Sequence, residues 1–104
     1  MGEHTLRVII SATHPSLAGH FPGNPIVPGV VLLDEVIAGL SGFVGKPVEV
    51  LAMPHVKFLA SVLPEQEFTI EYTTKSEGVV NFLLLLRGEK AVIGSLKFRI
   101  NLKT

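Results

Sequence analysis

Residues 28–47 read PGVVLLDEVIAGLSGFVGKP, a stretch that carries the start and stop signals of a single helix. Pro28 suits the first turn of a helix, where its missing N–H costs nothing, and Gly45 followed by Pro47 is typical of a helix end. These signals predict a helix over residues 29–44. Apolar side chains lie nearly all round its axis, so we expect the helix to be buried on most of its sides.

The segments on either side of this helix predict β-strands. Residues 5–12, before it, are rich in β-branched side chains, which favour strands. Residues 13–28 hold four of the seven prolines and cannot form regular structure, because each proline lacks an N–H and restrains its predecessor. After the helix, residues 48–62 alternate imperfectly, and Pro54 indicates a bulge or break in that strand.

Two further strands are predicted over residues 68–73 and 79–87, with turns at Ser-Glu-Gly 76–78 and Gly-Glu-Lys 88–90. The final strand has two distinct faces: Val92, Gly94, Leu96, Phe98, Ile100 and Leu102 on one, and Ser95, Lys97, Arg99 and Asn101 on the other. One strand, one helix and then an antiparallel meander make an α+β layout. A sheet curled around a central helix would explain why the helix has no polar face.

The composition predicts one soluble domain over residues 1–104. Apolar residues make up 47% of the chain, enough for a core, and nine basic residues balance nine acidic ones, so no basic surface predicts nucleic-acid binding. The chain has no cysteine, and no segment predicts a signal peptide or a membrane span. We therefore expect a cytoplasmic protein without membrane association. A mean hydropathy of +0.48 suggests that apolar surface is buried between subunits.

Two adjacent carboxylates, Asp34 and Glu35, interrupt the apolar helix. A buried, ionised carboxylate without partners is costly, so Asp34 must pair, take up a proton or face a cavity. The alternative is an ordinary surface acid on one side of the helix. Neighbouring residues point about 100° apart around a helix axis, so at most one of the two acids faces a given site. We expect the other to be solvated or in a salt bridge.

His20 and Gly29 are the other residues whose surroundings suggest chemistry. His20 lies between Gly19 and a run of prolines that would fix its backbone, as a pre-positioned base requires; a structural histidine is the alternative. Gly29 begins the helix, where unpaired N–H groups are open to a ligand oxygen; a tight entry turn is the alternative. The other histidines, His4, His14 and His55, have no spacing that suits a metal site.

Residues 19–35, GHFPGNPIVPGVVLLDE, resemble the motif of the 3-hydroxyacyl-(acyl carrier protein) dehydratases, which have the hot-dog fold. Their pattern is roughly G-H-F-P-x-x-P-x-x-P-G-V, followed by an acid fourteen residues after the histidine, which is Asp34 here. Residues 55–68, HVKFLASVLPEQEF, are similar to the family's V-K-F-x-x-x-V-x-P-G-D segment, with Glu65-Gln66 in place of Gly-Asp. Many short members have Glu at the acid position, and the presence of Glu35 leaves the choice between the two acids open.

The resemblance implies a hot-dog fold, an antiparallel sheet wrapped around one long helix, and a homodimer, with further assembly of dimers left open. It implies an active site at the dimer interface, with His20 from one chain and Asp34 from the other. His20 would remove the α-proton of a 3-hydroxyacyl thioester, Asp34 would protonate or orient the departing hydroxyl, and the Gly29 amide would polarise the thioester carbonyl.

Phe21, Pro28 and Val30 would contact the substrate beside Gly29. The resemblance implies a lyase of fatty acid or related lipid or polyene biosynthesis that needs no metal and no dissociable cofactor. Its acyl thioester would arrive on acyl carrier protein or on coenzyme A.

Two other functions stay open from the sequence. An acyl thioesterase on the same fold would use a helix carboxylate to activate water, and would not require a histidine in the proline-rich loop. A non-catalytic acyl-binding or dimerisation module would need neither residue. The presence of His20, Gly29 and Asp34 at matching spacing argues for the dehydratase.

Overall fold

The computed structural model describes residues 3–15 and 26–101, which form one α-helix and five β-strands. In chain order these elements are β1 (Glu3–Val8), α1 (Gly29–Val44), β2 (Val48–Phe58), β3 (Phe68–Ser76), β4 (Val79–Leu86) and β5 (Glu89–Ile100).

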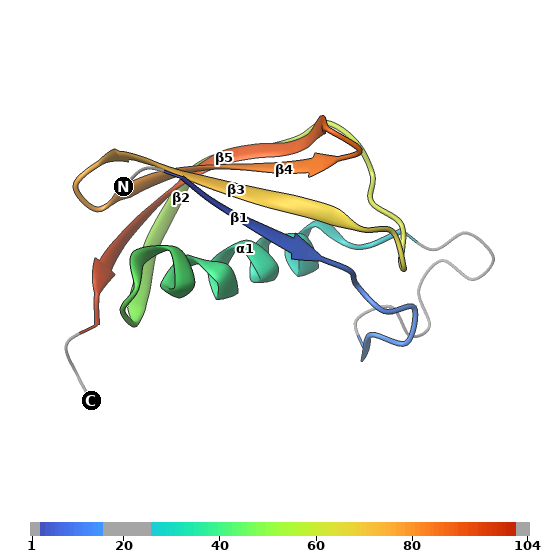
Figure 1. The fold of residues 1–104 in the computed structure, drawn as a ribbon, viewed down its shortest axis with the longest axis horizontal. Helices are drawn as coiled ribbons and strands as arrows, with labels where there is room; N and C mark the ends of the chain where they lie inside the picture. Colours follow the sequence, from blue (N-terminus) through green and yellow to red (C-terminus); the bar gives the residue numbers. More distant parts are fainter. Residues whose placement is uncertain (1–2, 16–25, 102–104) are drawn as a thin grey trace.

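The five strands form a single antiparallel sheet in the order β1-β3-β4-β5-β2, and α1 lies across one of its faces (Figure 1). The chain therefore leaves one edge of the sheet at β1, passes along the helix and returns at the opposite edge as β2. Strands β3, β4 and β5 fill the centre as consecutive hairpins. The predicted α+β layout is confirmed.

The predicted helix is confirmed at both of its ends. At its C-terminus Gly45 has a left-handed backbone, with φ of 83°, and its N–H donates a hydrogen bond of 2.7 Å to the carbonyl of Ser41. Glycine adopts this conformation without the penalty that a Cβ brings, which is why the helix stops here. At the other end Pro28 is the N-cap, with φ of −60° and ψ of 146°, one residue earlier than the first-turn position that we expected.

The helix is covered around most of its circumference and exposed along one stripe. Val31, Leu32, Val36 and Leu40 are at most 2% exposed and pack in the core against the sheet. Val30 on the other side is 65% exposed. The helix is thus at least partly buried on most of its sides, as expected, and it is open only along the stripe of Val30, Asp34, Ala38 and Gly42.

Tyr72 on β3 joins the sheet to the middle of the helix. Its hydroxyl is buried and donates a hydrogen bond of 2.6 Å to the carbonyl of Val36, and its ring stacks on Phe43 with centroids 5.6 Å apart. A Cβ at Gly39 would collide with the Tyr72 hydroxyl and would come within 2.8 Å of Leu6. Glycine at position 39 therefore makes room for the tyrosine, and the resulting bond fixes the helix over β3.

Two predicted strands are shorter than expected. The first stops at Val8 because the next residues bond to the loop before β3: the N–H of Glu65 donates to the carbonyl of Ile10, and the N–H of Ala12 donates to the Glu65 carboxylate. Strand β2 stops at Phe58, and the N–H groups of residues 59 and 60 both donate to the Ala91 carbonyl.

Other local features agree with the sequence-based predictions. The register of β2 against β5 shifts between Val50 and Ala52 and again before His55, which places the irregularity around Pro54 as predicted. The turn between β4 and β5 lies at Arg87 and Gly88, one step before the expected one, with φ of 54° and 81°.

Strand β5 has the two faces that were predicted: within the described residues Val92 and Leu96 are fully buried, whereas Lys97 and Arg99 are exposed. Leu102, which we expected on the buried face, lies outside the described residues. Within the part of the chain that the structure describes, no helix is long and apolar enough to cross a membrane.

Candidate active site

Among the described residues, nothing pairs with the first backbone N–H groups of α1. The N–H groups of Val31 and Leu32 donate to the carbonyl of Pro28, over 3.0 and 3.4 Å, so the amides of Gly29 and Val30 precede the first of these bonds. Among the described residues no side chain caps the helix, and its first turn carries no acidic residue. Free N–H groups and the positive end of the helix dipole together attract an oxygen that carries or develops negative charge.

Phe58, the last residue of β2, packs against the start of the helix. A Cβ at Gly29 would come within 2.8 Å of the Phe58 Cζ, so this side of Gly29 accommodates the ring only because glycine has no side chain. Half of Phe58 (50%) remains exposed, which leaves its ring as an apolar wall beside Gly29. The sequence alone indicated no role for Phe58, although this residue lies in the V-K-F segment at 56–58.

Large apolar side chains are exposed around this end of the molecule. Val30 is 65% exposed, Leu59 47% and Leu63 44%, and the N–H of Val27 bonds to the carbonyl of Val62, which ties the loop after β2 to the entry of the helix. An exposed apolar cluster of this kind marks a binding surface. The helix start therefore combines polar donors with apolar surface, as an acyl thioester would require.

Asp34 lies one turn beyond Val30, on the open side of the helix, and its side chain is exposed. Glu35 is half-buried and takes part in neither of the ion pairs found among the described residues, which are Arg7–Glu67 and Arg99–Glu49. The sequence left two possibilities open for Asp34, an acid that faces a cavity or a surface acid, and in the single chain it is a surface acid. The reason is that the sheet leaves this stripe of α1 open.

Glu35 instead influences the buried tyrosine. Burial, together with the nearby negative charge of Glu35, raises the pKa of Tyr72 well above its usual value. The phenol is therefore kept in the protonated form that donates to Val36. This makes Glu35 part of the surroundings of a structural hydrogen bond, on a different side of the helix from Asp34.

Four of the predicted site residues lie near one another. Pro28, Gly29 and Val30 lie together at the helix start, with Asp34 one turn along. His20 and Phe21 lie outside the described residues, so their roles stay predictions. Within residues 3–15 and 26–101, no three histidine, aspartate or glutamate side chains gather closely enough to hold a metal ion.

A family model described as ApeI-like, ApeI dehydratase, matches residues 1–98 of this sequence. The chain belongs to the ApeI-like dehydratase family. A curated relative, the 3-hydroxyacyl-(acyl-carrier-protein) dehydratase FabZ of Latilactobacillus sakei, is 31% identical over 111 residues, covering 95% of this chain and 79% of the relative. The resemblance to hot-dog dehydratases that rests on residues 19–35 and 55–68 is therefore confirmed.

Solved structures show the same fold. The dehydratase heterocomplex ApeI:P from Xenorhabdus doucetiae matches with a TM-score of 0.81 and 21% identity, over 93% of this chain and 87% of that one. The (R)-hydratase from A. caviae involved in PHA biosynthesis matches with a TM-score of 0.75 and 17% identity, over 95% and 94% of the two chains. These likenesses confirm the hot-dog fold.

The chain spans about half the length of some curated relatives that it matches, for example 48% of the FabZ dehydratase of Syntrophobacter fumaroxidans, where identity is 30% over 70 residues. The family and the fold are thus established, whereas the substrate and partners of this chain have to be argued from its own residues.

Proposed function

We propose that this protein removes water from a 3-hydroxyacyl thioester to give a trans-2-enoyl thioester. The observation that carries the proposal is the helix start at Gly29, which no described side chain caps and which lies beside the half-exposed ring of Phe58 and about one turn before Asp34. A thioester carbonyl oxygen fits the helix amides, and its acyl chain fits the apolar wall. Membership of a dehydratase family supports the same chemistry.

The proposed reaction divides its steps among three groups. His20 removes the proton from the carbon next to the thioester carbonyl, and the Gly29 amide stabilises the negative charge that then gathers on the carbonyl oxygen. Asp34 gives its proton to the hydroxyl on the next carbon, so that the C–O bond breaks and water leaves. Proton exchange with solvent then restores the neutral His20 and the protonated Asp34.

The proposed active form is a homodimer in which a second copy covers the open side of α1. An exposed Asp34 cannot act on a substrate held away from water, but it can do so if a partner closes over it. Exposed apolar residues support this closure, with Val30 on the helix and Leu51, 52% exposed, on the edge strand β2. The similar ApeI structure is a heterocomplex, which supports a site completed between two chains.

The proposed substrate arrives as a thioester of acyl carrier protein or of coenzyme A, and we propose that the reaction takes place in the cytoplasm. The names of the curated relatives support the carrier-protein form. Neither source changes the groups that the helix start would contact, because the thioester and the acyl chain are common to both.

The test is to incubate the protein with 3-hydroxyacyl and trans-2-enoyl thioesters, on both carriers, and to follow double-bond absorbance and free thiol separately. Reversible interconversion of the two thioesters without thiol release is the expected result. Release of free thiol with no addition or loss of water would instead identify a thioesterase. Binding of the thioesters without either reaction would identify an acyl-binding module.

A further inference from the structure

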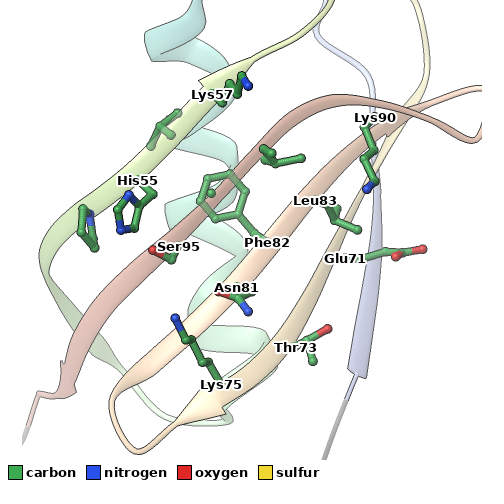
Figure 2. A pocket seen from close by; sticks show the side chains of 14 residues that line it. His55, Lys57, Glu71, Thr73, Lys75, Asn81, Phe82, Leu83, Lys90 and Ser95 are labelled. Carbon is green, nitrogen blue, oxygen red and sulfur yellow. The ribbon is translucent and has the colours of Figure 1, made fainter.

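The sheet has a groove of about 800 Å³ on the face that points away from α1, formed by side chains of β2, β3, β4 and β5 (Figure 2). Pockets that hold small organic ligands have volumes of roughly 300 to 1,000 Å³. The proposed acyl site lies on the other side of the sheet, because Phe58 faces the helix whereas its neighbour Lys57 lines the groove. The groove is therefore a second feature, and a ligand bound in it does not depend on the proposed dehydration.

The strand register brings four hydrogen-bonding side chains into one row across the groove. His55 is paired with Ser95, Ser95 with Asn81, and Asn81 with Thr73, so each of the four strands contributes one residue. Because directly opposed residues share a face of a sheet, these side chains lie next to one another on the outer side. Figure 2 shows them along the groove.

Ser95 is the most buried polar residue of this row, at only 6% exposed. Among the described residues, no polar side-chain atom is both fully buried and unpaired, so the Ser95 hydroxyl reaches the surface of the groove that it lines. The hydroxyl is therefore open to water, and a ligand oxygen in the groove would replace that water as its hydrogen-bond partner.

Three lysines surround the row. Lys57, Lys75 and Lys90 line the groove, and within residues 3–15 and 26–101 none of them is in an ion pair. In the described lining the one carboxylate is that of Glu71, so the groove is cationic although the chain as a whole has no net charge. A second copy of this chain is disfavoured as the occupant, because like charges would then face each other.

The next row of side chains across the four strands has two apolar residues at its centre. Ile93 is paired with Leu83, and both side chains are half-buried on the outer face, between Lys57 and Glu71 at the ends of the same row. An anion without an apolar part would leave these side chains unused. Ammonium groups bind phosphate as point charges, and hydroxyl, amide and imidazole groups can complete its hydrogen bonds.

We propose that the outer groove binds a phosphate ester, whose phosphate contacts the Ser95 row and Lys75 beside it while its apolar body covers Leu83 and Ile93, toward Lys57 and Lys90. The same chemistry is offered by a free organic phosphate and by the nucleotide end of coenzyme A. Binding to this face leaves the helix start of the same chain accessible.

The test is calorimetric titration of the full chain with hexyl phosphate, with inorganic phosphate and with hexanol. Hexyl phosphate is expected to bind more tightly than either fragment, because it alone offers both the charge and the apolar body. Replacing the three lysines together (K57Q/K75Q/K90Q) is expected to weaken binding by at least about tenfold, and Ser95→Ala by about two- to tenfold. The control is Lys46→Gln, an exposed lysine outside the groove, which is expected to bind as the wild type does.

Equal affinity of the triple variant and the wild type, with circular dichroism showing both folded, would overturn the proposal. So would inorganic phosphate binding as tightly as hexyl phosphate, or hexyl phosphate failing to bind. Competition between coenzyme A and hexyl phosphate distinguishes the two sources. Displacement by coenzyme A that is lost in the triple variant supports the site and assigns it to the nucleotide, whereas hexyl phosphate binding without displacement supports a free phosphate ester.

Discussion

The covered part of helix α1 and its open stripe differ in exposure and in side chains. Val31, Val36 and Leu40 on one side are at most 2% exposed beneath the sheet, whereas Val30 on the other side is 65% exposed and Asp34 is exposed as well. The covered side holds the fold together. The open side has apolar surface and a carboxylate that a single chain does not use, so it is the side on which we place the chemistry.

The largest expected effect comes from the open side. Asp34→Asn keeps the size and hydrogen bonding of the side chain but removes its transferable proton, so we expect kcat for dehydration to fall by about 100-fold or more. The melting temperature should change little, because asparagine keeps the size and the hydrogen bonding of the side chain. Steady-state kinetics and thermal unfolding of the same samples measure the two effects.

Glu35→Gln is the matched control for Asp34→Asn, since it makes the same chemical change one residue further on. It should leave kcat within a few-fold of the wild type, because Glu35 faces the surroundings of Tyr72. If Glu35→Gln loses activity and Asp34→Asn does not, the catalytic acid is Glu35 and not Asp34.

On the covered side Leu40→Ala should lower the free energy of unfolding by about 2–5 kcal/mol, because it leaves a cavity in a fully buried part of the core. Urea unfolding should give the same loss at every protein concentration, since this side chain is buried within one chain. A loss below about 1 kcal/mol would mean that the covered side does not hold the fold together as described.

Val30→Ala makes a comparable truncation on the open side, where we expect a smaller loss of about 1 kcal/mol. The loss should depend on protein concentration, because Val30 is proposed to contact a second copy, and association contributes to stability by mass action. Unfolding curves at several protein concentrations, together with sedimentation, show whether Val30 contacts a second copy or only its own chain. A loss that is the same at every concentration would show that the open side is not an interface.

The smallest effect concerns the hydrogen bond that joins β3 to the helix. Tyr72→Phe removes the donor to Val36 and should cost about 1 kcal/mol. Because folding raises the pKa of Tyr72, its contribution is complete below the unfolded-state pKa of about 10 and is lost as the pH rises from there through the higher folded-state pKa.

Tyr72 is the only tyrosine and the chain has no tryptophan, so phenolate absorbance reports this group alone. The wild type should titrate at higher pH when folded than in urea, and its stability should decline more steeply in alkali than that of Tyr72→Phe. If Tyr72 titrated at the same pH in the folded and in the unfolded protein, folding would not raise its pKa, and the predicted dependence of stability on pH would be refuted.

The sequence predicted the features that depend on local chemistry. Gly45 and Pro28 define the helix, and alternation along β5 assigned its two faces, because caps and strand periodicity act within a few residues. It did not predict which stripe of α1 stays open, since an apolar helix has no pattern to show which neighbour covers which side. For the same reason it did not reveal the contact of Phe58 with Gly29, which joins residues far apart in the sequence.

The approach of Tyr72 to Gly39 was missed for a similar reason, since a glycine in a helix shows its purpose only when the partner strand is in place. Of the site, the helix start and its glycine were predicted, and the exposure of Asp34 was not. The sequence left the burial of Asp34 open, because an apolar helix does not show which stripe the sheet leaves uncovered.

The most direct test of a site completed by the open side of α1 is to mix two inactive variants. His20→Ala and Asp34→Asn should each be inactive alone, and a mixed dimer of the two should contain one intact site, provided that the site takes His20 from one chain and Asp34 from the other. With equal amounts and full subunit exchange, we expect about one quarter of wild-type activity, because half of the dimers are mixed and each has one of two sites. No recovery, with exchange demonstrated by mass, would contradict the shared site and place both residues within one chain.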